Sequence, residues 1–454
     1  MVQVVAHLVR CGHEAMVIAP GAGPDSYHGV PVVRVPAVDL PVVDSVPVGL
    51  PTRKVVTALR DFGPDIVHLA SRVIVGALGL WAARRLAVPT VAVYQTDLAG
   101  FADSYGLGFA ARTAWRWIRR VHSGADRTLT PSSSAAVALT AHGVPRVHRW
   151  ARGVDTGHFR PSRRDERLRA QLAPGGEVLV GFVGRLAPEK KVLRLSALQD
   201  LPGIRLVVVG DGPDRGQLAK QLPTAAFLGF KTGIELAQVY ASLDVFVHTE
   251  PFETFCQTVQ EALASGLPVI APDAGGPRDL VAHGHTGFLL PETGNNADAT
   301  FGDALRRAIL ALAHDSALRT RYGAAARRSV LDAPGQRSAT NCSSIMPRSP
   351  ACQQISSEWR EANAHRPAGK LLRSAIRRPA HRLAPFGRRI HRPRSRSRAG
   401  GARTPAERRD DAQRGPTNHA ARCEDPVYWW ISRGRPKPGA CVTGRVASRP
   451  NRGL

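Results

Sequence analysis

Cysteine is scarce in this chain. Only Cys11 and Cys256 occur in the first 332 residues, and the other four of the six lie beyond residue 333. Two cysteines in so long a segment exclude a disulfide framework and a cysteine-based metal cluster there, and they fit a reducing cytoplasm. The chain also lacks the run of about 18 apolar residues that a membrane-spanning helix needs. We therefore expect a cytoplasmic protein, with any membrane contact peripheral.

Acidic and apolar residues are both scarce beyond residue 333. Residues 333–454 contain 26 basic and 7 acidic residues, whereas residues 1–332 contain 36 basic and 29 acidic ones. The same tail has only 13 Leu, Ile, Val and Phe residues, too few for a highly charged segment to build a core. We predict that residues 333–454 form a disordered, basic tail.

Two interpretations of this tail stay open. Its 24 Arg and 2 Lys are typical of GC-rich DNA translated out of frame, so the tail would be a frameshifted product. Alternatively, it is a true basic arm that binds anionic lipid or nucleic acid. Nucleic-acid binding is not expected of the rest of the chain, because its charge is nearly balanced.

Short apolar runs alternate with segments of helical periodicity along the first 331 residues. Continuous Val, Ile and Leu runs are typical of strands buried on both faces, and their alternation with helices predicts parallel, doubly wound sheets. The predicted strands are Ala15–Ala19, Asp65–Leu69, Pro89–Tyr94, Asp126–Thr130, Val178–Val183, Arg205–Gly210, Asp244–Thr249, Pro268–Pro272 and Gly287–Leu290.

The periodicity lapses in a turn-rich stretch near residues 155–176, which predicts a linker. We expect an α/β protein with two Rossmann-like domains, residues 1–158 and 176–331, that face each other across a cleft. In open α/β sheets, ligands bind beyond the carboxyl ends of the strands. The first domain starts unusually, since Val2–Cys11 is predicted to be helical and no strand or glycine-rich turn precedes it. We expect its first strand to be missing.

A glycine and two cations follow the predicted strand Val178–Val183. Gly184 permits a tight turn beside a ligand, Arg185 offers a planar fork of donors, and Lys190 offers a point charge. Cations at the carboxyl end of a strand suit a pyrophosphate. The alternative is a solvated loop that is merely basic.

Two glutamates eight residues apart follow another predicted strand. Glu253 and Glu261 flank the start of a predicted helix, and eight helical residues span about 12 Å. This is about the reach from a transferred sugar to a nucleoside ribose. The backbone N–H groups of Phe255, Cys256 and Gln257 would lie at the helix N-terminus, where phosphate can bind. The alternative is a pair of surface carboxylates.

Together these segments resemble the family 4 retaining glycosyltransferases of the GT-B fold. The resemblance rests on Gly184-Arg185 with Glu189-Lys190, on the Glu253/Glu261 pair, and on Asp273–Leu280; in the first domain, Asp65–His68 and Gly153–Asp155 agree. Other details, such as residues 94–97 and 252–257, look closest to bacterial GDP-mannose-dependent α-mannosyltransferases of glycolipid synthesis.

The resemblance implies a role for each of these residues. Arg185 and Lys190 would bind the donor pyrophosphate, Glu253 the transferred mannose and Glu261 the ribose. Gly184 and the amides of Phe255, Cys256 and Gln257 would line the phosphates, while Gln95 and Asp97 would contribute from the first domain. Gln95 stands where many members have a histidine.

The function implied is transfer of mannose from GDP-mannose to a lipid-linked acceptor at the inner face of the cell membrane, with retention of configuration. No Asp-x-Asp triplet occurs, so we expect no metal and no cofactor besides the nucleotide-sugar substrate. The alternative is a catalytically impaired remnant of the GT-B fold whose basic tail binds anionic lipid or nucleic acid.

A basic, aromatic helix face is predicted around residues 112–120. Four arginines fall at helical spacing beside Trp115 and Trp117. Such a face is compatible with a membrane interface, and also with a solvated helix whose tryptophans belong to the core.

Overall fold

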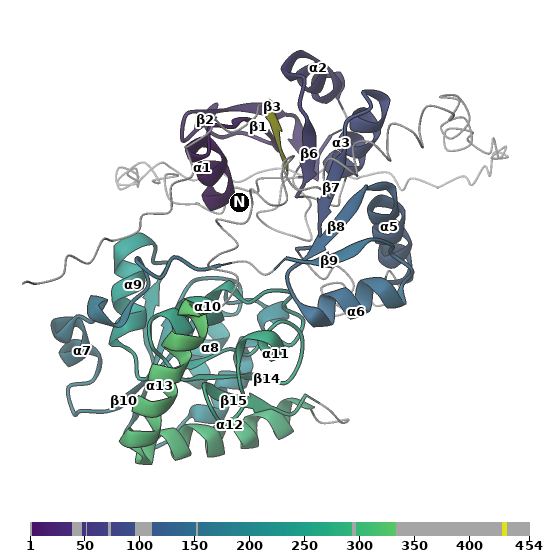
Figure 1. Cartoon of the computed structure of the whole chain (residues 1–454). Coiled ribbons are helices and arrows are strands. Elements are labelled where there is room, and N and C mark those ends of the chain that lie inside the picture. Colours follow the sequence, from purple (N-terminus) through teal and green to yellow (C-terminus); the bar gives the residue numbers. More distant parts are fainter. Residues whose placement is uncertain are drawn as a thin grey trace, which may run out of the picture. The chain divides into compact units, whose positions relative to one another are not determined.

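The computed structural model describes residues 2–38, 48–50, 52–70, 74–95, 111–150, 153–292, 297–332 and 429–433. These residues form an N-terminal and a C-terminal α/β domain, each built on its own sheet (Figure 1). The predicted fold class is confirmed, and every predicted strand is found to within two residues at either end. Among the described helices, none has the length and apolarity to span a bilayer.

The N-terminal domain is an eight-stranded sheet with helices from the same part of the chain. Its strands are β1 (Glu14–Pro20), β2 (Ser26–Tyr27), β3 (Val30–Val35), β6 (Ile66–Leu69), β7 (Thr90–Val93), β8 (Arg127–Thr130), β9 (Val147–Arg149) and β16 (Trp429–Arg433). Its helices are α1 (Val2–Arg10), α2 (Arg53–Phe62), α3 (Ile74–Arg85), α5 (Ala111–Gly124) and α6 (Ser133–Ala141), and β4 (Ala37–Val38) pairs separately with β5 (Val48–Gly49).

Strand β16 corrects the prediction of a tail disordered throughout. It lies between β1 and β6 and runs antiparallel to both. The sheet order β3-β1-β16-β6-β7-β8 places it where the first strand of a 3-2-1-4-5-6 sheet belongs. Without a strand there, β1 and β6 would each leave a row of backbone groups unpaired. Residues 333–428 and 434–454 lie outside the described part of the chain, so both interpretations of the tail stay predictions.

The C-terminal domain has a six-stranded, fully parallel sheet. Its strands are β10 (Val178–Val183), β11 (Ile204–Val209), β12 (Ala226–Gly229), β13 (Val245–Val247), β14 (Val269–Pro272) and β15 (Gly287–Leu290). Its helices are η3 (Pro188–Lys190), η4 (Val192–Leu198), α8 (Arg215–Gln221), α9 (Gly233–Ser242), α10 (Gln257–Ala264), α11 (Pro277–Leu280), α12 (Ala297–His314) and α13 (Ser316–Leu331).

Both faces of this sheet are covered, as the continuous apolar runs predict. Alternate residues of β10 point to opposite faces: Leu179 packs in a core with α9, α10 and α13, and Val180 packs in a second core with η4, α8 and α12. Figure 1 shows α13 beside α10 and α12 crossing below β15. Full burial of each such side chain contributes roughly 1.5–3 kcal/mol, so the sheet is a rigid support for the loops at its carboxyl edge.

The predicted linker is more ordered than its turn-rich composition indicates. It contains η2 (Pro161–Arg163) and the short helix α7 (Glu166–Leu172). The Asp165 carboxylate accepts hydrogen bonds from the amides of Arg167 and Leu168 at the start of α7, which is the usual role of aspartate at a helix N-cap. Seven residues are too few to show a clear helical period in the sequence.

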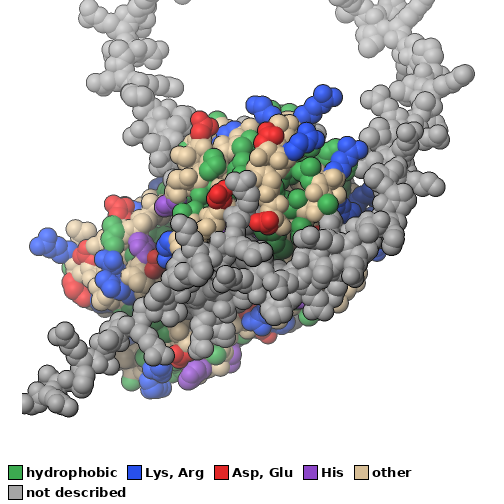
Figure 2. All heavy atoms as spheres, turned by 45° about the horizontal axis from the view of Figure 1, so that its top comes forward, with side chains coloured by type: hydrophobic (Ala, Val, Ile, Leu, Met, Phe, Trp, Pro, Cys, Tyr) green, Lys and Arg blue, Asp and Glu red, His purple; other side chains and the backbone are tan. Residues whose placement is uncertain are grey.

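Charged side chains of both signs are interspersed among the described residues on the face that Figure 2 presents. This agrees with the nearly balanced charge of residues 1–332.

Gly287 provides a test of the sheet. At its φ of +157°, a Cβ atom would lie 1.8 Å from the carbonyl oxygen of Val269 on the neighbouring strand. We expect Gly287→Ala to lower the free energy of unfolding by roughly 3 kcal/mol, measured by urea denaturation. Gly216→Ala in α8 is the matched control, because a Cβ there meets nothing within 4 Å. Equal stability of the two variants would contradict the packing described here.

Candidate active site

The strand order of the C-terminal sheet determines where its loops converge. The order β12-β11-β10-β13-β14-β15 reverses direction between β10 and β13, the first and fourth strands of the domain. At such a reversal the loops leaving the two strands run to opposite sides and open a crevice at the carboxyl edge. The residues after β10 begin with Gly184, and those after β13 begin with His248. Both sequence motifs therefore reach the same edge.

The loop after β10 is fixed to the loop after β11. The Gly184 amide donates to Val209, and the Leu186 amide donates to Asp211. At Gly210, whose φ is +128°, a Cβ atom would lie 1.9 Å from the Gly184 carbonyl oxygen. Only glycine permits this close approach. The turn at Gly184 is thus held by backbone contacts, and it fixes the start of the basic loop.

Lys190 joins the two strand ends. Its Nζ lies 2.5 Å from Glu250 Oε2 and 2.7 Å from Glu253 Oε2, although the carboxylates are 60 and 63 residues away in sequence. Its carbonyl oxygen also accepts a hydrogen bond of 2.6 Å from Thr249 Oγ1. These three contacts bring the predicted residues Lys190 and Glu253 together and add Glu250, which the sequence motifs did not identify.

The Lys190 ammonium sits between two carboxylates in a mostly buried position. Burial by itself would lower the pKa of Lys190, but the charges of Glu253 and Glu250 hold it above its ordinary value. Burial and repulsion from Glu253 raise the pKa of Glu250 to about 9. Burial would also raise the pKa of Glu253, yet Lys190 and the hydrogen bond from Glu250 hold it at about 2. At neutral pH the group is therefore one ammonium, one carboxylate and one carboxylic acid, with no net charge.

Arg185 is the more accessible of the two predicted cations. About a third of its side chain is exposed, and Nη1 lies 3.5 Å from Glu189 Oε1. This distance is at the long limit for a hydrogen bond, so Glu189 holds the guanidinium only weakly. Arg185 is positioned by the fixed turn at Gly184 and keeps donors for a ligand.

His248 and Cys256 are close enough to Lys190 and Glu253 to interact with them electrostatically. Both are buried, and Cys256 Sγ is 3.6 Å from His248 Nε2. Burial lowers the pKa of His248 to about 4, with Lys190 adding to the effect, and burial raises the pKa of the Cys256 thiol. Both groups are therefore neutral at pH 7, and His248 is packed in the interior directly after β13.

The start of α10 carries a backbone feature that the sequence does not reveal. Cys256 is its N-cap residue, with φ +61° and no hydrogen bond from its side chain to the helix. A cysteine in the left-handed region is uncommon, and such positions occur often at functional sites. Gln257 is the first residue of the helix and Phe255 immediately precedes the N-cap, so both lie near the N-terminal end, where the first backbone N–H groups have no partner within the helix.

Glu261 lies about one turn further along α10, beside Tyr240 of α9. Burial, and then the negative charge of Glu261, raise the pKa of the Tyr240 hydroxyl. Glu261 is half-buried and is not part of the Lys190 cluster. Glu253 therefore lies in the loop before α10 and Glu261 lies within the helix, in separate environments; their roles toward a ligand stay predictions.

The residues predicted from the first domain are only partly described. Gln95 follows β7, is half-buried, and its Nε2 donates to the Ala70 carbonyl at 3.4 Å. Asp97 lies outside the described residues.

Arg194 and Glu292 form an ion pair beside the residues that follow β13. The sequence did not identify this pair as part of the site. The buried Arg194 contacts both oxygens of Glu292, at 2.8 and 2.6 Å. It also donates to the Thr249 carbonyl at 3.1 Å, and Thr249 in turn holds Lys190. The signal was weak, because a lone arginine in a basic segment resembles a solvated residue.

A metal could in principle find ligands here. His248, Glu250 and Glu253 each offer one ligand atom, all within 4.8 Å of one another. The Lys190 ammonium, however, already contacts both carboxylates, and it supplies the positive charge that a metal would bring. That the protein needs no metal stays a prediction.

Comparison with known proteins shows that both domains match glycosyltransferase families. Residues 1–158 match the family described as Glycosyltransferase Family 4, and residues 163–329 match the one described as Glycosyl transferases group 1. Over 337 residues the chain is 56% identical to a GDP-mannose-dependent alpha-mannosyltransferase of Mycobacterium tuberculosis (strain CDC 1551 / Oshkosh), covering 73% of this chain and 87% of the relative.

Two further similarities are more distant. A GDP-mannose-dependent alpha-(1-6)-phosphatidylinositol dimannoside mannosyltransferase of Mycobacterium tuberculosis (strain ATCC 25177 / H37Ra) is 31% identical over 282 residues, covering 58% of this chain and 72% of the relative. The crystal structure of Anabaena Alr3699/HepE in complex with UDP and glucose superimposes with a TM-score of 0.59 at 22% identity, covering 76% of this chain and 96% of that one. The latter similarity shows a shared fold.

Glu250 gives a test of the charge cluster. Its pKa is about 9 in the folded protein against an ordinary value of 4.5. Between these pH values Glu250 is protonated in the folded state and ionised in the unfolded state. The free energy of unfolding therefore falls as pH rises from about 4.5 to about 9. Glutamine does not titrate, so we expect Glu250→Gln to lose this slope, by on the order of several kcal/mol over the interval.

Urea unfolding at a series of pH values measures the effect. Glu235→Gln, at an exposed position on α9, is the control that should keep the wild-type slope. Parallel profiles for wild type and Glu250→Gln would show that Glu250 is ionised at neutral pH.

Proposed function

The chain belongs to the glycosyltransferases that combine a family 4 N-terminal domain with a group 1 C-terminal domain, and we propose that it transfers mannose from GDP-mannose to a lipid-linked acceptor. The observation that carries this proposal is the meeting of the Arg185 loop and the Glu253 loop at the reversal point of the C-terminal sheet. A high identity to a GDP-mannose-dependent enzyme over most of that enzyme's length supports the choice of donor.

The two cations have different tasks in this proposal. Lys190 is neutralised by Glu253 and hydrogen-bonded to Glu250, so its first role is to hold the sugar-binding carboxylate in place. Arg185, with only a weak contact to Glu189, supplies the donors for the pyrophosphate. Charge that develops on GDP as it leaves is then stabilised by a guanidinium that is already in place.

The remaining predicted residues bind the rest of the donor. The Glu253 carboxylate, ionised because of Lys190, accepts hydrogen bonds from mannose hydroxyls. Glu261 accepts from the ribose hydroxyls, and the backbone amides of residues 255–257 approach the phosphates at the start of α10. Gly184 leaves room for the phosphates beside its turn. Gln95 and Asp97 contribute from the acceptor-side domain.

The proposed chemical step takes account of how the described carboxylates of the site are paired. The ionised carboxylate in the described cluster, Glu253, is held by an ammonium and is a poor candidate for covalent attack. We propose that the acceptor hydroxyl attacks from the same face that GDP leaves, with retention of configuration. The donor phosphate oxygen takes the acceptor proton, so atoms and charge balance without an enzyme base.

The name of one relative supports the proposed acceptor. This relative, with 31% identity, is named for a phosphatidylinositol mannoside substrate. We propose a lipid-linked acceptor for this chain as well, reached by peripheral contact with the inner face of the cell membrane.

Nucleotide binding tests the proposal directly. GDP at about 100 times its Kd adds about 2.7 kcal/mol to the free energy of unfolding, so we expect it to raise the melting temperature by several degrees. Arg185→Ala should abolish the shift, because the pyrophosphate loses its fork of donors. Differential scanning fluorimetry with GDP, UDP and ADP measures both effects.

Arg321→Ala is the matched control, since Arg321 is exposed on α13. It should keep the full shift. A protein whose melting temperature responds to none of the three nucleotides, or a shift that Arg185→Ala leaves intact, would contradict the proposal.

A further inference from the structure

Helix α5 has two contrasting faces. Ile118, Val121 and His122 are buried, and Ile118 packs in a small core with Tyr94 and Leu139. At 100° per residue, the opposite side collects exposed residues from every turn of the helix. These are Arg112, Thr113, Arg116, Trp117, Arg119 and Arg120, which we call the outer face of α5.

The outer face is strongly and uniformly basic. No Asp or Glu occurs between residues 104 and 125. Among the described residues, no salt bridge involves any of the four arginines of α5, whereas Arg194 and Arg278 of the C-terminal domain are paired with carboxylates. Arg146 adds a further guanidinium at the end of the helix, where it donates to the carbonyls of Ser123 and Ala125. Basic side chains without acidic partners are available to an external anion.

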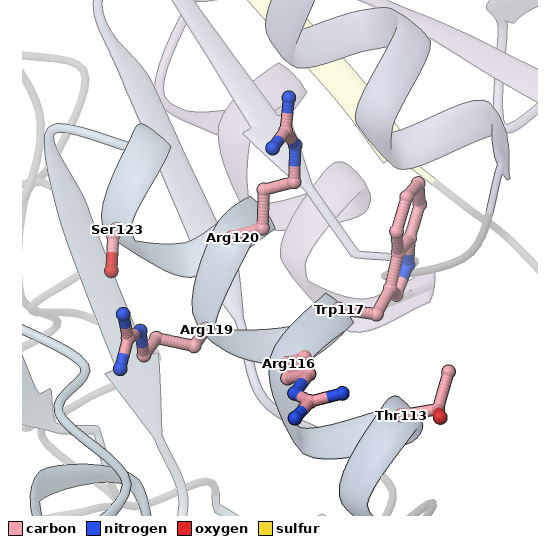
Figure 3. Close-up of a pocket in the computed structure, with 6 residues that line it drawn as sticks. All are labelled: Thr113, Arg116, Trp117, Arg119, Arg120 and Ser123. Atoms are coloured by element: carbon pink, nitrogen blue, oxygen red, sulfur yellow. The ribbon is translucent and has the colours of Figure 1, made fainter. Parts of the chain in front are cut away.

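These side chains border a hollow on the protein surface. It is lined by Thr113, Arg116, Trp117, Arg119, Arg120 and Ser123, all from α5 (Figure 3). Figure 3 shows the three arginine side chains leaving the helix in different directions, with Arg120 and the indole of Trp117 both pointing to the top of the view. Trp117 is 38% exposed, which is unusual for so large an apolar group.

We infer that the outer face of α5 docks the protein on a membrane of anionic phospholipid. The inference deepens the peripheral membrane contact proposed above and rests on it. Arginine forks bind phosphate head groups bidentately, and an indole is favoured at the boundary between head groups and acyl chains. A half-exposed tryptophan among arginines on a helix fits a lipid surface better than the stacked bases of a nucleic acid duplex.

Vesicle binding by the full chain tests this inference. We expect it to sediment with vesicles of phosphatidylcholine containing about one third phosphatidylglycerol, and not with phosphatidylcholine alone. Replacing the three arginines that line the hollow (Arg116→Gln, Arg119→Gln, Arg120→Gln) should weaken binding at least tenfold, since each arginine near an anionic surface contributes roughly fivefold. Trp117→Ala should also weaken binding, and Trp117→Phe should restore part of it.

The matched control removes the same charge elsewhere, as Arg307→Gln, Arg321→Gln and Arg328→Gln. These arginines are exposed on α12 and α13, so this variant should bind vesicles about as well as wild type. Equal losses for the two triple variants, or no loss in either, would overturn the inference and assign vesicle binding to net charge or to the basic tail.

Two further measurements separate the possible outcomes. Selective loss of duplex DNA binding in the α5 variant, with vesicle binding unchanged, would also overturn the inference, because nucleic acid would then be the partner. The GDP-induced shift in melting temperature should be the same in the α5 variant and in wild type. If the protein does not sediment with anionic vesicles but GDP raises its melting temperature, only the membrane inference is overturned. If GDP has no effect but the protein binds the vesicles through α5, only the transferase proposal is overturned.

Discussion

The contact of one ammonium group with two carboxylates organises the C-terminal domain around its binding edge. Lys190 comes from the loop after β10, and Glu250 and Glu253 come from the loop after β13. Two negative charges around one positive charge in a mostly buried position would be costly, so one carboxyl keeps its proton. The cluster of Lys190, Glu250 and Glu253 then has no net charge and keeps its hydrogen bonds. These contacts connect the loop after β10 to the loop after β13.

Neutrality of this cluster affects the neighbouring residues. Because Lys190 already contacts two carboxylates, Arg185 is the more accessible cation of the described loop after β10. Glu253 stays ionised at every physiological pH because Lys190 holds its pKa near 2. Arg194 and Thr249 form a second layer that fixes the position of Lys190 from behind. Electrostatic catalysis depends on such groups being held in place before the substrate arrives.

The N-terminal domain meets a different constraint. Its sheet needs a strand between β1 and β6, because both would otherwise expose unpaired backbone groups in the centre of the sheet. Five residues from near the end of the chain fill that place and run antiparallel. Antiparallel pairing satisfies the backbone as well as parallel pairing does, so the sheet is completed although the chain direction is reversed.

The sequence alone determined the elements and the motifs of this protein. Runs such as Val178–Val183 are strands because they are apolar enough to be buried on both faces, and their alternation with helices makes the sheets parallel. Arg185, Lys190 and Glu253 were candidates because they follow buried strands, and Glu261 was a candidate because of its spacing from Glu253. These patterns are local, and a local pattern can be read from residue types and spacing.

Only the tertiary structure decided which of these groups meet. The partnership of Lys190 with Glu250 joins residues 60 positions apart, and no spacing within either loop predicts it. The sequence likewise placed Trp429–Arg433 in a disordered tail, because nothing near those residues shows that β1 and β6, more than 350 residues away, need a strand between them. Protonation of Glu250 depends on burial and on two neighbouring charges at once, and these are set by the folded arrangement of the loops.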